Sequence, residues 1–501
     1  SAASDVYKRQ YQNFINGRHV PARSGKTYEN RNPADRSDLI GVFPASDIED
    51  IADAVRAAQG AYPAWRAMPA QARGDIMRSA TELLVARKEE CARLMTREMG
   101  KVIKETRGDV QEAIDTGYYA AGESRRLWGT VAPSEMPNKM CYVTRQPMGV
   151  WGMICPWNFP MAIPSWKLFP ALTCGNTAVI KPASLTPASV DAFVGCLAEA
   201  GVPEGVVNVV YGGGGKVGEA LLNHPDVCGI SFTGSSDVGR RIGEVCGRAL
   251  KRCSLELGGK NAQVVLDDAD LELALEGVLW GAFGTTGQRC TATSRLIVQA
   301  GVYDRMLEMV VERANALKVG NGLDEAVEMG PCVSAEQRRT VQEYVGIGRE
   351  EGARLAAGGE ALSGGEWDSG FFHQPTIFAD VTPDMRIAVE EIFGPVLSVI
   401  KVRDFEEAVR VLNGTPYGLS SSIYTRDVNL AMKAIELFEA GITYVNAPTI
   451  GAECHMPFGG VKDTGNGHRE GGWAAYEIFS EPKTVYVDYS GALQRAQIDN
   501  S

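Results

Sequence analysis

The sequence predicts an α/β protein built from two successive lobes, each a mostly parallel sheet covered by helices. Its 501 residues are 45% hydrophobic and 22% charged, which supplies several buried cores and excludes a disordered chain. From residue 141 onward, short apolar runs bounded by Gly and Pro alternate with segments of helical spacing, which is typical of βαβ units. A second alternating run begins after Leu257, so we expect the lobes to meet near residue 258.

The elements follow in order along the chain. Residues 47–119 place Ala, Arg, Glu and Leu at helical spacing and predict a helical lead-in. The first lobe is expected to hold strands at 150–155, 177–181, 206–211 and 229–232, with helices over 188–200 and 217–223. The second is expected to hold strands at 264–266, 295–299 and 396–402, with helices over 271–283, 303–319 and 334–351. Residues 483–489 alternate in polarity and predict an edge strand offered to another subunit.

Charge and hydropathy exclude several kinds of partner. The net charge is −12 and the pI is near 5.2, with no face-sized cluster of Lys or Arg, so we expect no nucleic acid and no anionic membrane surface as partner. The stretch 146–179 is apolar but is interrupted by five prolines, which suits buried strands and turns better than a membrane span. No signal peptide is visible and residues 1–10 form a polar tail, so we expect a cytoplasmic protein.

The cysteines and histidines give no metal motif. Eleven Cys are scattered without any Cys-x-x-Cys pair, and the five His include no His-Glu-x-x-His arrangement. We therefore expect no metal site and no disulfide framework. Most of the cysteines are expected to be small core residues in a reducing compartment.

Two glycine-containing turns are candidates for phosphate binding. Gly213-x-Gly215-x-x-Gly218 follows an apolar run and formally matches the dinucleotide fingerprint, but no acidic residue ends a next strand, so this motif decides nothing alone. The segment 231–239 ends a strand, turns through small residues and begins a helix, which suits a pyrophosphate. An ordinary capped turn remains the alternative there.

Three further residues carry possible catalytic chemistry. Cys290 lies among small residues beside Arg289, which favours an accessible, thiolate-prone nucleophile, although a buried core cysteine is the common alternative. Glu256 ends an apolar run, where partial burial would raise its pKa and suit a general base; a surface glutamate is the alternative. Asn158 stands between two prolines and is either a rigid oxyanion donor or a turn residue.

Taken together, these segments resemble the NAD(P)-dependent aldehyde dehydrogenase superfamily over about residues 14–489. The resemblance is carried by Pro-Trp-Asn-Phe-Pro (156–160), Phe-Thr-Gly-Ser (232–235), Glu-Leu-Gly-Gly-Lys (256–260), Gly-Gln-Arg-Cys (287–290) and Glu-Ile-Phe-Gly-Pro (391–395), in family order and at family distances. It implies two doubly wound α/β lobes and a small β oligomerisation element.

The resemblance also implies a mechanism. The Cys290 thiolate attacks the aldehyde, and the oxyanion is held by the Asn158 amide and the Cys290 backbone N–H. After oxidation to a thioester, Glu256 activates the water that releases the carboxylic acid. Lys167 and Glu470 assist a proton relay in family members, with a structural ion pair as the alternative.

For the cofactor, NAD or NADP, the family pattern implies fourteen contact residues. They are Ile154, Pro156, Trp157, Lys181, Ser184, Gly214, Phe232, Thr233, Gly234, Ser235, Val238, Leu257, Glu391 and Phe393. Ser184 stands where NAD-preferring relatives often carry Glu, so no carboxylate repels a 2′-phosphate and we predict that NADP is used alongside NAD.

The implied domains are an NAD(P)-binding domain (11–127 and 148–257), a catalytic domain (258–464) and an oligomerisation element (128–147 and 480–495) that predicts a homodimer or homotetramer. Trp166 stands where succinic-semialdehyde relatives place Arg, which favours an aliphatic or aromatic aldehyde. A semialdehyde whose carboxylate meets Arg289 or Arg295 is the alternative. Glu453 and His455, in the loop 446–456, are either pocket residues or surface residues.

Two rival functions are also considered. In a coenzyme-A-acylating relative, which typically lacks the Glu256 equivalent, a thiol receives the acyl group. A catalytically dead binding protein would not be expected to keep Cys290, Glu256 and Asn158 together.

Overall fold

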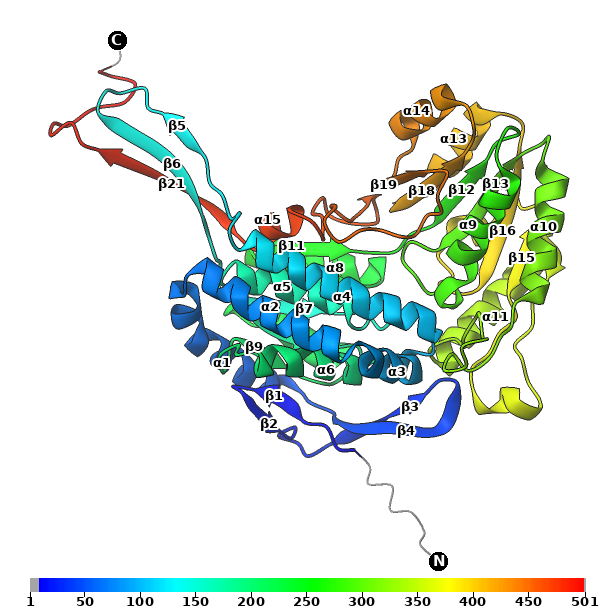
Figure 1. The fold of residues 1–501 in the computed structure, drawn as a ribbon, viewed down its shortest axis with the longest axis horizontal. Helices are drawn as coiled ribbons and strands as arrows, with labels where there is room; N and C mark the ends of the chain where they lie inside the picture. Colours follow the sequence, from blue (N-terminus) through cyan, green and yellow to red (C-terminus); the bar gives the residue numbers. More distant parts are fainter. Residues whose placement is uncertain (1–8, 500–501) are drawn as a thin grey trace, which may run out of the picture.

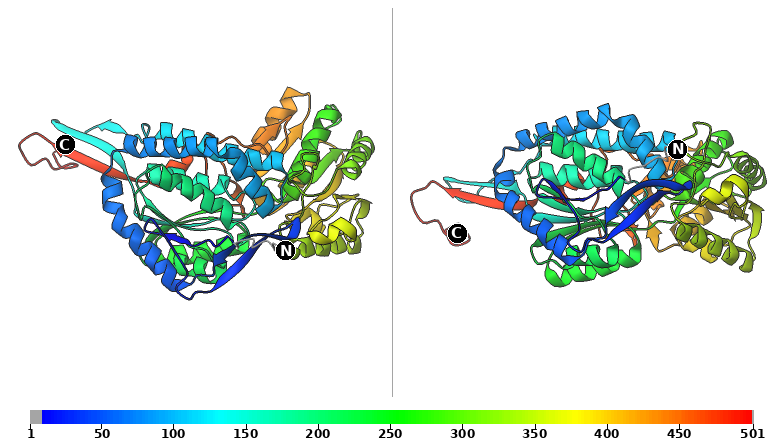
Figure 2. Two further views of the ribbon diagram at one scale, coloured as in Figure 1. Left: turned by 60° about the horizontal axis from the view of Figure 1, so that its bottom comes forward. Right: turned by 90° about the horizontal axis from the view of Figure 1, so that it is seen from below.

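The computed structural model describes residues 9–499, so most of the predicted polar tail lies outside the described residues. Two seven-stranded sheets form the centres of two lobes, and a three-stranded sheet projects from the first lobe as an arm (Figure 1). The mixed α/β fold with two successive lobes is therefore confirmed. Figure 2 shows that the arm extends away from both lobes in two further views.

The first sheet has the strand order β11-β10-β7-β8-β9-β1-β2. Its strands are β1 (Asn13–Ile15), β2 (Arg18–Val20), β7 (Val150–Ile154), β8 (Thr177–Lys181), β9 (Val207–Val209), β10 (Val227–Thr233) and β11 (Arg252–Glu256). The five strands from β7 to β11 are parallel, whereas β1 is antiparallel to both β9 and β2. A parallel sheet needs helices on both faces, and both faces are covered here.

The helices around this sheet form two layers. They are α1 (Ile48–Ala67), α2 (Ala70–Ala86), α3 (Lys88–Met99), α4 (Ile103–Glu123), α5 (Ala162–Thr173), α6 (Pro187–Glu199), α7 (Glu219–Asn223), α8 (Ser236–Ala249) and α15 (Ala474–Ile478). Along β8, Ala178 and Ile180 belong to the core beneath α2–α6, whereas Val179 belongs to the core beneath α1, α7 and α8. Burial on both faces explains why these strands are apolar throughout.

The second sheet has the order β14-β15-β16-β13-β12-β18-β19. Its strands are β12 (Asn261–Val265), β13 (Thr293–Gln299), β14 (Arg354–Ala357), β15 (Thr376–Ala379), β16 (Val396–Val402), β18 (Ser420–Tyr424) and β19 (Ile442–Val445). The helices of this lobe are α9 (Leu271–Phe283), α10 (Tyr303–Ala316), α11 (Ala335–Glu350), α12 (Arg386–Val389), α13 (Phe405–Asn413) and α14 (Val428–Leu437). Neighbouring residues of β13 again enter separate cores, Ile297 on one side and Leu296 and Val298 on the other.

The remaining strands form small sheets. The arm consists of β5 (Val131–Pro133), β6 (Lys139–Gln146) and β21 (Glu481–Asp488), and two hairpin-like pairs are β3 (Thr27–Asn32) with β4 (Asp35–Pro44) and β17 (Tyr417–Gly418) with β20 (Val461–Lys462). The predicted edge strand is β21, which pairs with β6 over eight residues and lies at the edge of the arm.

The structure corrects several element predictions. The strands β1–β4 are not predicted by the sequence analysis, because β1 and β2 have only three residues each, β3 is mostly polar, and β4 is polar in its first half and apolar in its second, without alternation. The strand expected at 206–211 is only three residues long as β9, and the helix expected at 217–223 divides into a π-helical turn (Gly214–Gly218) and α7. Within residues 9–499, no helix is both long and apolar enough to span a bilayer.

Candidate active site

The predicted site residues meet at the carboxyl edge of the first sheet. Lys181 ends β8, Ile154 ends β7, Thr233 ends β10 and Glu256 ends β11. The register places Ile154 beside Lys181 and Thr233 beside Glu256 on neighbouring parallel strands. In open α/β sheets, ligands bind at this edge.

A cavity of about 240 Å³ opens at that edge. Residues expected from the sequence make up most of its lining: Pro156, Trp157, Asn158, Thr233, Gly234, Ser235, Leu257, Cys290, Glu391 and Phe393, completed by Gly258 and Gln337. Ser235 also lines a second cavity of about 540 Å³, together with Ile154, Gly214, Phe232 and Val238. The two cavities therefore form neighbouring parts of one elongated site.

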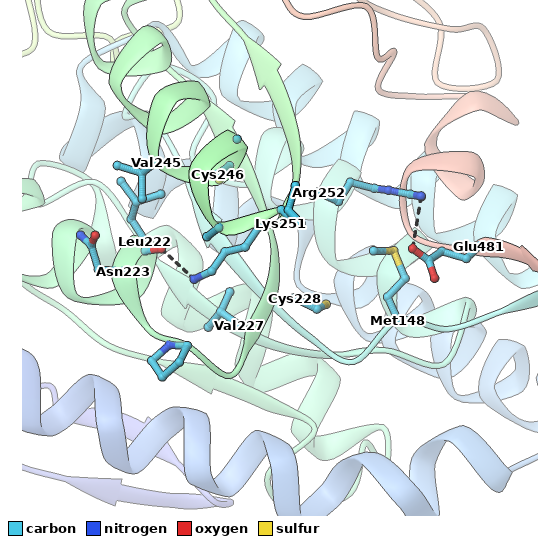
Figure 3. A pocket seen from close by; sticks show the side chains of 14 residues that line it. Met148, Leu222, Asn223, Val227, Cys228, Val245, Cys246, Lys251, Arg252 and Glu481 are labelled. Atoms are coloured by element: carbon cyan, nitrogen blue, oxygen red, sulfur yellow. Dashed lines mark hydrogen bonds and ion pairs between the residues drawn. The ribbon is translucent and has the colours of Figure 1, made fainter.

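A larger cavity, about 930 Å³, lies elsewhere and holds none of the predicted site residues (Figure 3). Its basic side chains are already bonded to the protein. The Lys251 ammonium donates to the carbonyl oxygen of Leu222 at 2.9 Å, and the Arg252 guanidinium reaches the Glu481 carboxylate at 3.5 Å. The volume of a cavity therefore does not identify the one that holds the predicted catalytic residues.

A strained turn presents Cys290. Thr285 and Thr286, in the 3-10 turn after α9 (Gly284–Gly287), have φ of 54° and 59°, in the left-handed region that β-branched residues rarely adopt. The Glu105 carboxylate from α4 accepts from the Thr285 backbone N–H at 2.8 Å and from Arg289 Nη2 at 3.2 Å. These bonds hold the turn in a conformation that its residues would not adopt alone.

The charge environment of Cys290 differs from the sequence prediction. Burial, together with the carboxylates of Glu256 and Glu391, raises the pKa of the thiol to about 12 and outweighs Arg289. Arg289 lies next to Cys290 in the sequence, but its guanidinium is paired with Glu105. The thiol of this structure is therefore not the thiolate that the neighbouring arginine suggests.

Asn158 lies on the loop between β7 and α5. It is buried and lines the same cavity as Cys290, and its Oδ1 has no hydrogen-bond partner within the described residues. Its backbone carbonyl, by contrast, accepts from the Lys101 ammonium at 2.9 Å. The main chain is therefore fixed while the side-chain amide faces the cavity.

Glu256 is a buried carboxylate without a partner. It is 3% exposed, and neither oxygen accepts a hydrogen bond from the described part of the chain. Gly459 leaves room for it, since a Cβ there would stand 2.5 Å from Glu256 Oε1. Burial raises the pKa of this carboxyl well above its ordinary value, Glu470 raises it further, and Lys167 lowers it.

Lys167 and Glu470 lie together behind Glu256. The Lys167 ammonium forms an ion pair with Glu470 Oε1 and donates to Ser231 Oγ at 2.9 Å. Ser231 Oγ in turn donates to Glu470 Oε1 at 3.2 Å. The other oxygen of Glu470 is buried and has no hydrogen-bond partner among residues 9–499, so the pair has one free acceptor there.

The residues expected to contact the cofactor fit a dinucleotide. Thr233 Oγ1 is buried without a partner beside the turn into α8, and Gly214 and Gly215 face open space. The Lys181 ammonium lies against this wall and donates to the Gly212 carbonyl at 3.0 Å, as does Ser184 Oγ at 3.1 Å. At the other end, Glu391 accepts from the Gly259 backbone at 3.0 Å.

The nicotinamide end of the predicted site has an aromatic wall. The rings of Trp157 and Phe393 meet edge to face, with centroids 5.3 Å apart. Burial raises the pKa of Glu391 to about 7. The contacts of all fourteen residues with a cofactor stay predictions.

The three candidate substrate residues, Trp166, Arg289 and Arg295, lie in different surroundings. Trp166 packs on Phe458, with ring centroids 4.9 Å apart, and Arg289 lies within 5.3 Å of the Phe159 ring and 5.8 Å of the Trp280 ring. The Arg295 guanidinium is fully buried and donates to the carbonyls of Lys260, Val411 and Leu412. Arg295 is therefore not available to a substrate carboxylate.

The structure does not favour the prediction that Glu453 and His455, in the loop 446–456, are pocket residues. Glu453 and His455 form an ion pair 3.5 Å long and are 73% and 54% exposed, and neither lines the two cavities. The surface interpretation of these two residues is the one that the structure favours.

Sequence reasoning missed the residues that hold the catalytic loops. Lys101 lies just before α4, and Glu105 and Asp109, spaced four residues apart on that helix, share one side of it. Asn261 is also missed; its side-chain amide donates to the carbonyls of Cys290 at 2.8 Å and Ala292 at 2.9 Å. The four-residue spacing of these charges is visible in the sequence. The loops that they hold, however, lie more than 50 residues away along the chain.

Comparisons with known proteins show the family of this chain. The aldehyde dehydrogenase family model matches residues 19–485. An alpha-ketoglutaric semialdehyde dehydrogenase of Bacillus subtilis is 44% identical over 95% of this chain and 98% of the relative. The NADP(+) succinate-semialdehyde dehydrogenase GabD of Escherichia coli is 39% identical over 97% of this chain and 98% of the relative.

A solved structure gives the same result for the fold. PnpE from Pseudomonas sp. WBC-3, in complex with nicotinamide adenine dinucleotide, superposes with a TM-score of 0.94 at 38% identity and covers 97% of this chain and 99% of that one. The family model and these relatives each span nearly the whole chain, and the chain belongs to the aldehyde dehydrogenase family.

Proposed function

We propose that this protein oxidises an aldehyde to a carboxylic acid with NAD or NADP, through a thioester on Cys290. The observation that carries the proposal is the convergence of Cys290, Asn158 and Glu391 on one cavity, with the unpartnered Glu256 carboxylate buried beside it. A nucleophile, an oxyanion donor and a base are the three groups that acyl transfer requires.

In the first step, the Cys290 sulfur attacks the aldehyde carbon and a C–S bond forms. The thiol proton leaves to a base, and Glu256 is the carboxylate that acts most strongly on this thiol. The oxygen that becomes negative is stabilised by the Asn158 amide and the Cys290 backbone N–H, because donors aimed at developing charge act in the transition state. A bound NAD or NADP would supply the acceptor for the hydride of the same carbon.

In the second step, Glu256, after passing the thiol proton to the groups behind it, takes a proton from water, which attacks the thioester and expels the Cys290 sulfur as the thiolate. A carboxyl with a raised pKa is a stronger base once it is ionised. Lys167, Ser231 and Glu470 form a connected set behind it. We infer that this set carries the proton onward.

For cofactor binding, we infer that Lys181 and Ser184 meet the adenosine ribose, and that the turn 233–235 at the start of α8 holds the pyrophosphate. A helix N-terminus supplies backbone N–H groups and positive potential to such an anion. Glu391 and Phe393 meet the nicotinamide end. The lobe of residues 11–127 and 148–257 is then the NAD(P)-binding domain, 258–464 the catalytic domain, and 128–147 with 480–495 the oligomerisation element.

For the substrate, we infer a semialdehyde that carries a carboxylate, the alternative considered from the sequence. Two of the relatives described above are semialdehyde dehydrogenases. Arg289 Nε donates to Thr285 Oγ1 and Nη2 to Glu105, which leaves Nη1 without a hydrogen-bond partner in the described structure. The aromatic pair of Trp166 and Phe458 packs along the carbon chain.

Two wider features belong to the same proposal. The exposed arm supports a homodimer or homotetramer, and all eleven cysteines are free thiols, which suits a reducing compartment such as the cytoplasm. Glu256 favours hydrolysis of the thioester over transfer to coenzyme A. Acyl-CoA formed in place of the free acid would identify the acylating alternative.

The first experiment measures NADH or NADPH formation with aliphatic, aromatic and carboxylate-bearing aldehydes. Activity with at least one aldehyde that disappears in Cys290→Ala is expected. A chain that binds cofactor but whose Cys290 is inert towards thiol reagents and every aldehyde would instead be the non-catalytic alternative.

The substrate class is tested with a matched pair, a five-carbon semialdehyde with a terminal carboxylate and pentanal. We expect Arg289→Met to raise KM for the semialdehyde by about tenfold or more, the value of one charge-assisted hydrogen bond, and to leave KM for pentanal unchanged. The control is Glu105→Gln, which loosens the same turn and should lower the rate of oxidation of both substrates by the same factor. Equal effects of Arg289→Met on both substrates would exclude carboxylate recognition by Arg289.

A further inference from the structure

Two opposite charges are buried where α4 meets the loop that carries Asn158. The side chains of Lys101 and Asp109 are 0% exposed, and Lys101 Nζ lies 2.7 Å from Asp109 Oδ2. Neither residue lines the cavity of Cys290. The pair therefore does not touch the reacting atoms.

Each member of the pair also binds the main chain of the Asn158 loop. Lys101 Nζ donates to the backbone carbonyl of Asn158 at 2.9 Å and lies 3.8 Å from the centre of the Phe159 ring. Asp109 Oδ1 accepts from the backbone N–H of Ala162 at 2.7 Å, at the first residue of α5. The loop is thus held at three points between residues 158 and 162.

Stability alone is a weak reason for these charges. A buried ion pair contributes little net stability compared with packed apolar side chains, because both groups lose their hydration. It does impose direction, since an ammonium and a carboxylate bind only donors and acceptors placed at defined positions. Here those positions are the carbonyl of Asn158 itself and the N–H of Ala162, four residues later.

We propose that the Lys101–Asp109 pair is a positioning device for Asn158, and that oxyanion stabilisation depends on it. Asn158 Oδ1 has no partner of its own, so the direction of its amide is set by the backbone that Lys101 holds. A displacement of about 1 Å in a catalytic group can cost about a hundredfold in rate. The proposal rests on the oxyanion role assigned to Asn158 under the proposed function.

The test is a double-mutant cycle on the rate of the first NADH burst, with Lys101→Met, Asn158→Ala and the double variant. We expect each single variant to slow the burst by about a hundredfold. In the Asn158→Ala background, Lys101→Met should change the rate by no more than about twofold, because the group through which it acts is already absent. Multiplication of the two effects would overturn the proposal.

A matched control lies one turn away on the same side of α4. Glu105→Gln loosens the Cys290 turn through Thr285, so its effect should multiply with that of Asn158→Ala. Alkylation of Cys290 by iodoacetamide, without cofactor, should slow in Glu105→Gln but stay within about twofold of wild type in Lys101→Met. A large loss of alkylation in Lys101→Met would show general disruption and overturn the proposal.

Two further results separate the alternatives. If Asn158→Ala alone leaves the burst unchanged, the oxyanion assignment fails and the positioning proposal falls with it, whereas loss in Asn158→Ala with an additive Lys101 effect rejects only the positioning step. If Lys101→Met does not fold, the same cycle is run with Asp109→Asn, which removes the charge partner but keeps an oxygen for Ala162. The same non-additivity is expected.

Discussion

At the scale of single residues, the ionisable groups of the site are set by burial more than by their sequence neighbours. Arg289 precedes Cys290, yet its charge is paired with Glu105 and the thiol pKa is raised. Glu256 is likewise buried without a hydrogen-bond donor among the described residues, and burial raises the pKa of its carboxyl. Burial therefore shifts both groups of the proposed mechanism toward their proton-bound forms.

The pH dependence of thioester hydrolysis follows from Glu256. Because the pKa of this carboxyl is raised in the folded protein, the base is protonated at low pH and forms only as pH rises through the raised value. We expect kcat to rise with pH across that window and Glu256→Gln to lower kcat about 10²–10⁴-fold and remove the rising limb. Stopped-flow NADH formation should show a slower burst in this variant, because Glu256 also takes the thiol proton before the first oxidation.

The matched variant for this limb is Lys167→Met. The Lys167 charge lowers the pKa of Glu256, so its removal should move the limb to higher pH without abolishing it. A Glu256→Gln enzyme that keeps the wild-type limb would contradict the assignment of Glu256 as the base.

Cofactor choice is also a property of one residue. Ser184 donates to the Gly212 carbonyl and brings no negative charge to the adenosine end of the site. We expect Ser184→Glu to shift the ratio of kcat/KM for NADP over NAD by at least about tenfold toward NAD, because a carboxylate repels a 2′-phosphate. Ser184→Ala, which removes the hydroxyl without adding charge, should leave the ratio within about twofold. If the wild-type kcat/KM for NADP were a thousandfold below that for NAD, the prediction that Ser184 permits the use of NADP would be wrong.

At the scale of elements, the sequence predicts those helices and strands whose apolar residues repeat at a regular local spacing. The strands β8 and β16 and the helix α9 match their predicted bounds, because strands buried on both faces and amphipathic helices leave a pattern in neighbouring residues. The strands β1–β4 leave no such pattern, since β1 and β2 have only three residues each and neither β3 nor β4 alternates between polar and apolar residues. The left-handed turn at Thr285 and Thr286 also escapes prediction, since its conformation is imposed by Glu105, which is 180 residues away.

The same division holds for the candidate site. Cys290, Glu256 and Asn158 were predicted because each lies in a short motif of the family pattern. Lys101 and Asp109 were missed because their role depends on contacts with residues 158–162, which no spacing within residues 101–109 encodes. Local sequence thus identified the groups facing the cavity, and the three-dimensional structure was needed to identify the groups that hold them.

At the scale of the whole molecule, the site lies where two cores with separate packing meet. The link from β11 to β12 carries Gly258, Gly259 and Lys260 directly from the first sheet to the second. A Cβ at Gly258 would stand 2.5 Å from Glu391 Oε2, so the link between the two sheets leaves no room for a side chain at residue 258. Residues of both lobes therefore face one cavity, and movement of the lobes would change the distance between Glu391 and Asn158.

The arm is the part of the molecule that its own lobes leave uncovered. Val131, Tyr486 and Val487 are 77%, 66% and 43% exposed on a sheet that projects from the body (Figure 1). Because apolar side chains and an open strand edge are costly in water, we expect the arm to pack against a second copy of the chain. Light scattering at micromolar concentration should give a dimer or tetramer, and Val131→Asp with Tyr486→Asp should shift the mass toward the monomer. Val85→Asp, on the exposed face of α2, is the control that should leave the mass unchanged; a monomeric wild-type protein would contradict this role of the arm.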